Sequence, residues 1–245
     1  MKHRFSRTRA PSTQDIARPE DSAGSQAHGT VERRIVTIPP IGLTGTLSIP
    51  QAATALVVFA HGSGSSRFSR RNVAVAEALN AQGIATLLFD LLTSEEEGDR
   101  ANVFDIPLLA ERVVDAVDWV SSQPLTLRIG LFGASTGAAA ALVAAAQLGE
   151  RVGAVVSRGG RPDLAGAVLD YIQTPALLIV GGDDIPVIEL NEQAFARLRG
   201  PKSLEIVPGA SHLFPEPGAL EAVIHHATEW FKRYLSPSEP SKSSC

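Results

Sequence analysis

The stretch that decides the fold is "LRIGLFGASTGAAAA", residues 127–141. An apolar run that favours a buried strand ends at Phe132, and an alanine-rich run that favours a helix begins at Gly137. Between them, Gly133 and Gly137 stand symmetrically about Ser135. A very tight turn needs neighbours with almost no side chain, so this spacing predicts a serine raised on a sharp strand-to-helix turn. The alternative is a small-residue helix that simply packs close to a sheet.

Strand and helix patterns alternate along the chain on both sides of this stretch. Two β-branched runs, 31–40 and 42–50, predict a hairpin. Buried strands are expected at 55–60, 84–90, 127–132, 153–157, 176–181 and 203–207, and helices at 72–83, 107–122, 137–149, 187–200 and 218–235. Strands joined through helices pair in parallel. The pattern therefore predicts an α/β fold with a mostly parallel sheet of about eight strands and helices on both faces.

Composition limits the classes of function. The 245 residues are 44% hydrophobic, which suits one domain at 31–235 between polar tails at 1–30 and 236–245. A formal charge of −4 argues against nucleic-acid and membrane-surface partners. The only cysteine is Cys245, so no internal disulfide or thiolate metal site is expected. No signal peptide or membrane span is recognisable, and a cytoplasmic location is expected.

Polar side chains follow three of the expected strands. Ser135 comes after the fifth strand, Asp183 and Asp184 after the seventh, and His212 after the eighth. Because the carboxyl ends of parallel strands meet at one edge of a sheet, we expect these side chains to gather there. A serine hydroxyl becomes a nucleophile when a neutral imidazole takes its proton, and a carboxylate orients that imidazole. The sequence therefore predicts a Ser-His-Asp triad.

Several stretches together resemble the α/β-hydrolase superfamily, and within it the dienelactone-hydrolase-like branch. They are "GASTG" at 133–137, "HGSGSS" at 61–66 and "PGASHLF" at 208–214, with the chain order Ser, Asp, His. The resemblance covers roughly residues 32–235. It implies hydrolysis of small carboxylic esters or lactones through an acyl-enzyme, without a cofactor. The dienelactone hydrolases proper have a cysteine nucleophile, whereas this chain has Ser135.

The resemblance also implies individual roles. The related pattern places the acid two residues before a proline, which favours Asp184 over its neighbour Asp183. The backbone N–H groups of Thr136 and Ser63 are expected to form the oxyanion hole. A thioesterase or an amidase with the same triad is a close alternative, and a catalytically silent binding module of the same fold is the non-enzyme alternative.

Three other side chains are candidates for substrate binding. Arg158 and Arg161 follow the sixth expected strand and are placed near the mouth of the site, where a guanidinium could hold a substrate carboxylate. The alternative for Arg161 is a surface ion pair with Asp163. His61 is a rival base, or a support for its loop.

Two absences complete the expectations. The connection between the sixth and seventh strands is short, which leaves no room for a substantial lid and predicts an open cleft for a small-molecule ester. No two histidines have the helical spacing of a zinc site, so no metal is expected. The sequence does not indicate the oligomeric state.

Overall fold

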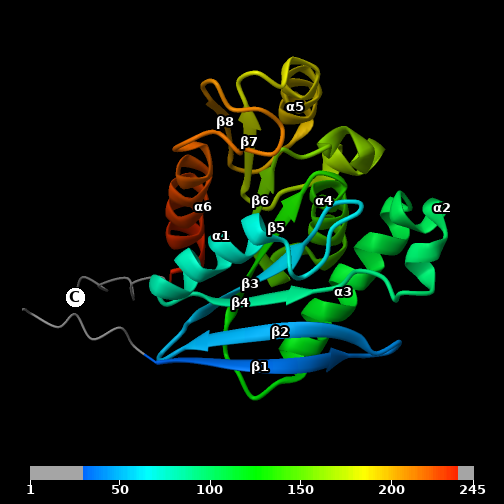
Figure 1. Ribbon diagram of the computed structural model, residues 1–245, viewed down its shortest axis with the longest axis vertical. Coiled ribbons are helices and arrows are strands. Elements are labelled where there is room, and N and C mark those ends of the chain that lie inside the picture. Colours follow the sequence, from blue (N-terminus) through cyan, green and yellow to red (C-terminus); the bar gives the residue numbers. More distant parts are fainter. Residues whose placement is uncertain (1–29, 237–245) are drawn as a thin grey trace, which may run out of the picture.

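The computed structural model describes residues 30–236, so most of both expected tails lies outside the described part of the chain (Figure 1). One sheet of eight strands runs through it, in the order β1-β2-β4-β3-β5-β6-β7-β8. The strands are β1 Val31–Ile38, β2 Leu43–Pro50, β3 Ala55–Ala60, β4 Ala85–Phe89, β5 Arg128–Ala134, β6 Val152–Arg158, β7 Ala176–Gly181 and β8 Lys202–Val207.

The direction of the strands agrees with the predicted pattern. β1 pairs with β2, and β2 with β4, in antiparallel fashion. All other neighbours, from β4 through β3, β5, β6 and β7 to β8, are parallel. The carboxyl ends of β3, β5, β6, β7 and β8 therefore lie along one edge of the sheet. The mostly parallel α/β-hydrolase architecture expected from the sequence is confirmed.

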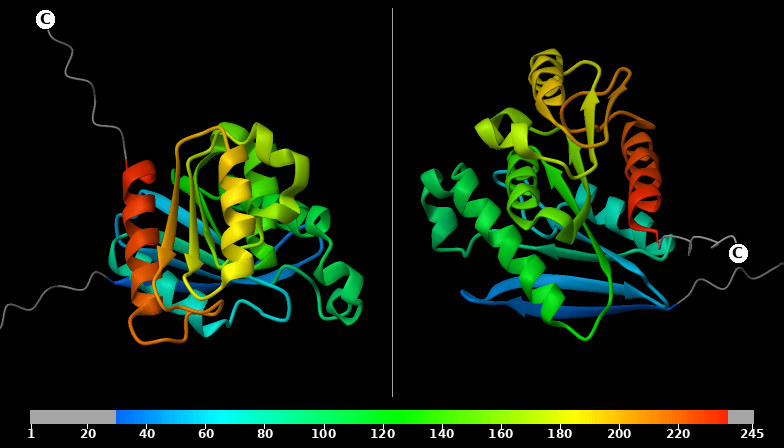
Figure 2. Two further views of the ribbon diagram at one scale, coloured as in Figure 1. Left: turned by 90° about the horizontal axis from the view of Figure 1, so that it is seen from above. Right: turned by 180° about the vertical axis from the view of Figure 1, so that it is seen from behind.

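Helices cover both faces of the sheet (Figures 1 and 2). On one face lie α1, Arg70–Ala81, and α6, Ala219–Leu235. On the other lie α3, Ile106–Ser122, α4, Thr136–Leu148, and α5, Ile185–Arg197. Each helix lies within a few residues of its predicted range. α3 begins at an N-cap, Asp105, whose carboxylate accepts from the Leu108 N–H, followed by a proline in the first turn.

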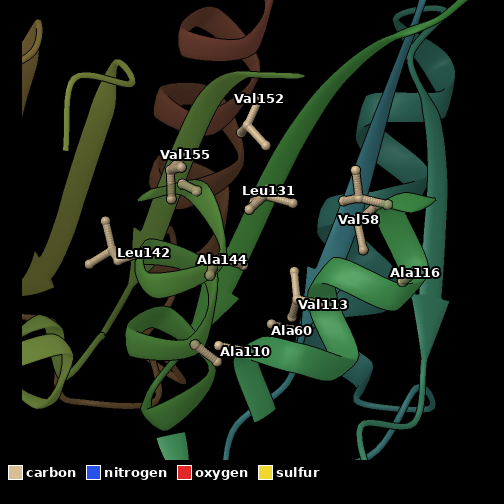
Figure 3. Close-up of a cluster of buried hydrophobic side chains, with 14 of the residues drawn as sticks. Val58, Ala60, Ala110, Val113, Ala116, Leu131, Leu142, Ala144, Val152 and Val155 are labelled. Atoms are coloured by element: carbon tan, nitrogen blue, oxygen red, sulfur yellow. The ribbon is translucent and has the colours of Figure 1, made fainter. Parts of the chain in front are cut away.

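The small side chains of the alanine-rich α4 allow α3 and the central strands of the sheet to pack close to it. Its alanines from Ala138 to Ala141 are completely or almost completely buried, which leaves room for α3 and the central strands to pack directly on α4. Figure 3 shows this cluster, in which strand residues meet α3 and α4: Val58, Ala60, Leu131, Val152 and Val155 from the sheet, Ala110, Val113 and Ala116 from α3, and Leu142 and Ala144 from α4.

Short elements between β4 and α3 were not predicted. They are a 3₁₀ turn, Glu96–Gly98, and the one-turn helix α2, Arg100–Val103. The Thr93 N–H donates to the Glu96 carboxylate at 2.8 Å, and the Glu96 N–H donates to the Thr93 hydroxyl at 3.2 Å. This reciprocal pair is a capping box, and its Thr-x-x-Glu pattern was a readable signal for the start of the turn.

The connection between β6 and β7 contains no lid. It forms a 3₁₀ helix, Pro162–Tyr171, which packs on α4 and α5. Within residues 30–236, no helix is long and apolar enough to cross a membrane. The same residues contain no group of three or more His, Cys, Asp or Glu side chains that could hold a metal ion.

Candidate active site

Ser135 lies on the turn between β5 and α4 with φ 53° and ψ −123°. A positive φ is strained for a residue with a side chain, and such strain persists only where the surroundings hold it. The Ser135 N–H donates to the Arg158 carbonyl at 3.3 Å, and the Ser135 carbonyl accepts from the Ala138 and Arg161 N–H groups, each at 3.1 Å. The turn is thus held from both α4 and the residues after β6.

The glycines around Ser135 are required by close backbone approaches. A Cβ on Gly133 would lie within 3.0 Å of the Gly137 carbonyl and the Ala138 backbone. A Cβ on Gly137 would clash instead with the carbonyls at the end of β3, those of Ala60 and His61. The prediction of a tight turn explains Gly133 directly. Gly137 has a second reason that the local sequence did not indicate, which is contact with a neighbouring strand.

His212 and Asp184 are in direct contact. The His212 Nδ1–H donates to Asp184 Oδ2 at 2.7 Å. Asp184 is the N-cap residue of α5, directly after β7, and its side chain is 15% exposed. Asp183 is exposed, and its backbone N–H donates to the Ala210 carbonyl at 3.0 Å. Of the two neighbouring aspartates, the structure brings Asp184 to the histidine.

The loop that carries His212 is anchored at several points. The Ser211 N–H donates to Glu216 Oε2 at 3.1 Å, and hydrogen bonding with Ser211, first through its side chain and then through its N–H, lowers the pKa of Glu216. Phe214 is buried at φ 55°. A Cβ on Gly159 would lie 2.8 Å from the His212 carbonyl and 3.8 Å from the ring atom Cε1. His212 therefore lies against the residue after Arg158, whose carbonyl accepts from Ser135, so the three expected triad residues share one edge.

The loop after β3 meets α4 through a hydrogen bond that the sequence did not indicate. The Ser63 N–H donates to the Thr136 hydroxyl at 3.0 Å, although the two residues are 73 positions apart. Both were expected to contribute backbone N–H groups to an oxyanion hole. In this structure the Ser63 N–H points at the Thr136 side chain, which is almost fully buried. Thr136 thus holds the loop with its hydroxyl.

His61 supports its loop and does not direct a ring nitrogen at substrate. Its Nδ1–H donates to the Gly62 carbonyl at 3.0 Å, and its Nε2 accepts from the Leu91 N–H at 3.1 Å. Burial lowers the pKa of His61, which is consistent with this neutral tautomer. His61 was expected to be a rival base or a substrate-binding residue. Both of its ring nitrogens instead bond to backbone groups, so it supports its loop, as the alternative stated.

Arg158 was expected at the mouth of the site, and this was wrong. β6 extends through Arg158, whose side chain points to the same face as Ala154 and Val156, toward α1 and α6. It is 5% exposed, its Nη2 donates to Asn72 Oδ1 at 3.1 Å, and its guanidinium lies 5.9 Å from the centre of the Phe214 ring. Burial, with repulsion from Arg71, lowers its pKa to about 10.

Arg161 forms the ion pair with Asp163 that was the alternative to substrate binding. Its Nε and Nη2 donate to the two carboxylate oxygens of Asp163 at 2.9 and 2.8 Å. A bidentate pair uses the face of the guanidinium that would otherwise hold a substrate carboxylate. The expectation of a carboxylate-binding Arg161 is corrected for this reason.

A cleft of about 450 Å³ lies beside the loop after β3. It starts at Gly62, where an added Cβ would lie 2.9 Å from the Ser135 Cβ. One wall consists of loop residues and the other of the segment that leads from β4 into α3. The lining residues are His61, Gly62, Ser63, Gly64, Ser65, Ser66, Phe68, Ser69, Leu91, Leu92, Glu97, Val103 and Leu109. We call this feature the loop cleft. The sequence did not indicate its second wall.

The sequence model of the family described as alpha/beta hydrolase domain matches residues 53–226. The chain belongs to the α/β-hydrolase family. Its fold and sequence are those of the dienelactone-hydrolase-like branch: the crystal structure of a dienelactone hydrolase from Anabaena variabilis ATCC 29413 is 55% identical, with a TM-score of 0.81. That match covers 85% of this chain and 100% of the Anabaena chain.

Two other similar proteins differ more from this chain, the first in sequence identity and TM-score and the second in length. Est1E from Butyrivibrio proteoclasticus shares the fold, with a TM-score of 0.71 at 18% identity over 82% of this chain and 98% of its own. A Mycobacterium tuberculosis H37Rv protein named "Putative phosphoribosyl transferase" is 57% identical over 204 residues. Those residues are 82% of this chain and 46% of the relative. The chain therefore spans about half the length of that protein.

Proposed function

We propose that the chain is a serine hydrolase that cleaves small carboxylic esters, lactones included, through an acyl-enzyme. The observation that supports this most is the 2.7 Å contact between His212 Nδ1 and Asp184 Oδ2, at the sheet edge where Ser135 stands at a positive φ. Asp184 holds the His212 ring with its Nδ1 protonated, which leaves Nε2 free to accept a proton. Family membership gives the class of reaction, and the site residues give its steps.

In the proposed mechanism, Ser135 Oγ attacks the carbonyl carbon while His212 takes the hydroxyl proton. The negative charge on the carbonyl oxygen is stabilised by the Thr136 N–H, at the start of α4, and by the Ser63 N–H. Since the Ser63 N–H points at the Thr136 hydroxyl in this structure, the oxyanion competes for it with that hydroxyl. His212 then protonates the leaving alcohol, and water releases the acyl group by the same steps in reverse.

Thioester or amide substrates are the second candidate for the same triad. The machinery acts on any activated acyl group, so the leaving group decides between them. Measured kcat/KM values for an ester, a thioester and an anilide of one acyl group distinguish the three. We expect the ester to be preferred to the anilide, because the carbonyl carbon of an amide is less electrophilic and its amine is a poorer leaving group than an alcohol.

Phosphoribosyl transfer is not part of the proposal. The name belongs to a relative about twice as long as its match to this chain. A phosphorylated ribose carries several negative charges, and the described residues that line the loop cleft include no Lys or Arg. The matched residues 53–226 are those of the hydrolase family.

A fluorophosphonate probe tests the proposal. We expect it to label the wild-type chain at Ser135, as shown by peptide mapping, and to leave Ser135→Ala unlabelled. Ser94→Ala, which removes an exposed hydroxyl outside the loop cleft, is the matched control and keeps full labelling. A chain that hydrolyses no activated ester and is not labelled would be the binding module, and labelling at another serine would refute the assignment of the nucleophile.

A further inference from the structure

The loop cleft has two chemically different walls. The loop wall presents backbone and small hydroxyl side chains from Gly62 to Ser66. The opposite wall is apolar, with Leu91, Leu92, Val103 and Leu109. A substrate group that extends from Ser135 past Gly62 into the cleft therefore meets a hydrocarbon surface on one side. The cleft volume of about 450 Å³ lies in the range of small-molecule sites.

One carboxylate stands in this cleft. Glu97 is the only Asp, Glu, Lys or Arg among the described residues that line it. It forms no ion pair with another residue of the part of the chain that the structure describes. Burial lowers the pKa of His61, and the hydrogen bond to the Gly62 carbonyl, then the charges of Asp90 and Glu97, partly oppose this, so the charge of Glu97 acts on a residue that lines the cleft. Glu97 is thus an uncompensated negative charge at the substrate cleft.

Four arginines around the site have other contacts. Arg67 pairs with Asp90 and Arg161 with Asp163. Arg112 pairs with Glu96 at 3.0 Å, and Arg158 is buried on the face of the sheet that α1 and α6 cover. None of these four cations lines the loop cleft. A carboxylate on the substrate would therefore meet Glu97 without a compensating guanidinium.

The position of Glu97 is well defined. The residue before it, Glu96, forms the capping box with Thr93 and also accepts from Arg112 Nη2 on α3. The Glu97 N–H donates to the Thr93 carbonyl at 2.9 Å. The backbone that carries Glu97 is thus tied to α3.

We infer that the loop cleft selects esters whose group beside the loop is apolar and either uncharged or positively charged at its far end, and that Glu97 is the residue that discriminates against substrates with a free carboxylate. This inference rests on the proposed function, since it assigns a substrate class to the same site. It gives the site the opposite charge preference from the one expected when Arg158 and Arg161 were placed at its mouth.

The size of the effect follows from the exposure of Glu97. An exposed pair of charges is worth little in water, typically a few-fold in an equilibrium constant. Glu97 attracts a cationic ester and repels an anionic one, so both effects increase the ratio of kcat/KM between the two substrates. We therefore expect kcat/KM for a cationic ester to exceed that for its anionic counterpart by about fivefold at low salt.

The test uses three activated esters of equal chain length that end in a methyl, a carboxylate or a trimethylammonium group. A second set carries the same three ends on the alcohol side, because either part of the ester can occupy the cleft. In the wild type, we expect the trimethylammonium ester to be hydrolysed faster than the carboxylate ester in at least one set. Glu97→Gln reduces that ratio to near one, and Glu97→Lys inverts it. Sodium chloride at about 0.5 M also reduces the wild-type ratio.

Glu95→Gln is the matched control, because Glu95 is an exposed acid on the same segment that does not line the cleft. It keeps the wild-type ratio. A wild-type ratio of one or less in both sets, or a ratio that survives in Glu97→Gln, overturns the inference. Hydrolysis of no ester at all would refute the proposed function instead. In that case, calorimetric binding of the intact esters to Ser135→Ala still decides the charge preference, with the same order of affinities expected.

Discussion

Asp184 Oδ2 lies 2.7 Å from His212 Nδ1, although the two residues are 28 positions apart and follow different strands. β7 and β8 are parallel neighbours, so their carboxyl ends bring both residues to one edge. A Cβ on Gly181, the last residue of β7, would clash with the carbonyls of Ala210 and Ser211. The missing side chain at Gly181 is what lets the histidine loop approach the aspartate.

Asp184→Asn should lower kcat by several orders of magnitude, about 10⁴-fold in the best-studied protease triad. An amide in place of the carboxylate no longer fixes the His212 tautomer or stabilises the imidazolium. Asp183→Asn is the matched control and should stay within a few-fold of the wild type. Steady-state hydrolysis of an activated ester measures both. Equal losses in the two variants would contradict the assignment.

Gly137→Ala should destabilise the fold by about 3 kcal/mol, because its Cβ would overlap the carbonyls at the end of β3 and neither backbone can yield without moving a strand. Gly98→Ala is the control, since nothing lies within 4 Å of a Cβ at that position. Urea unfolding of both variants gives the comparison. A Gly137→Ala variant as stable as the wild type would show that the turn packs less tightly than described.

Thr136→Val should lower kcat/KM by about tenfold, because the loop after β3 loses its tie to α4, and the resulting loss of position of the Ser63 N–H outweighs the removal of a competitor for it. Thr136→Ser keeps the hydroxyl and should stay within a few-fold of the wild type. The serine variant separates the hydrogen bond from the volume of the side chain. Full activity of Thr136→Val would mean that the hydroxyl does not position the loop.

Glu96→Gln should lower the free energy of unfolding at pH 7 by about 1 kcal/mol or less. The hydrogen bond from the Thr93 N–H, followed by the charge of Arg112, lowers the pKa of Glu96 below its usual 4.5. A lowered pKa in the folded state means that the stabilisation is complete above the usual value and is lost as the pH falls through the lowered one. The difference between variant and wild type should therefore shrink as the pH falls below 4.5. Urea unfolding at pH 7 and at a series of lower pH values tests this, and a difference that grows in acid would contradict it.

Acyl chain length should limit the rate. Each methylene that enters the apolar wall of the loop cleft contributes about 0.8 kcal/mol of binding, whereas one that stays in water contributes nothing. With a cleft of about 450 Å³ and no lid between β6 and β7, we expect kcat/KM to fall for linear acyl chains of about eight carbons or more. A series of 4-nitrophenyl esters measures the profile. A maximum at long chains would refute the open-cleft interpretation.

The local sequence was sufficient for the fold and for placing the proposed reacting groups at one edge of the sheet. The periodicity and length of the apolar runs distinguish buried strands from helices, and the glycines on both sides of Ser135 indicate a tight turn, although the contact of Gly137 with the end of β3 was not visible in the sequence. Because chain order assigns each polar residue to a strand end, Ser135 and His212 could be placed at one edge before any contact was known. The family resemblance was needed to choose Asp184 over Asp183, to assign the Thr136 and Ser63 N–H groups, and to name the class of substrate.

Tertiary structure decided what the charged side chains do. Arg158 and Arg161 are three residues apart in "SRGGRP", yet one is buried under the sheet against Asn72 and the other pairs with Asp163. The face of a strand and the nearest partner set the direction of a guanidinium, and neither is visible in spacing alone. The loop cleft has the same origin: Glu97 stands at its wall because Arg112 on α3 holds Glu96, a contact between residues whose proximity only the folded chain creates.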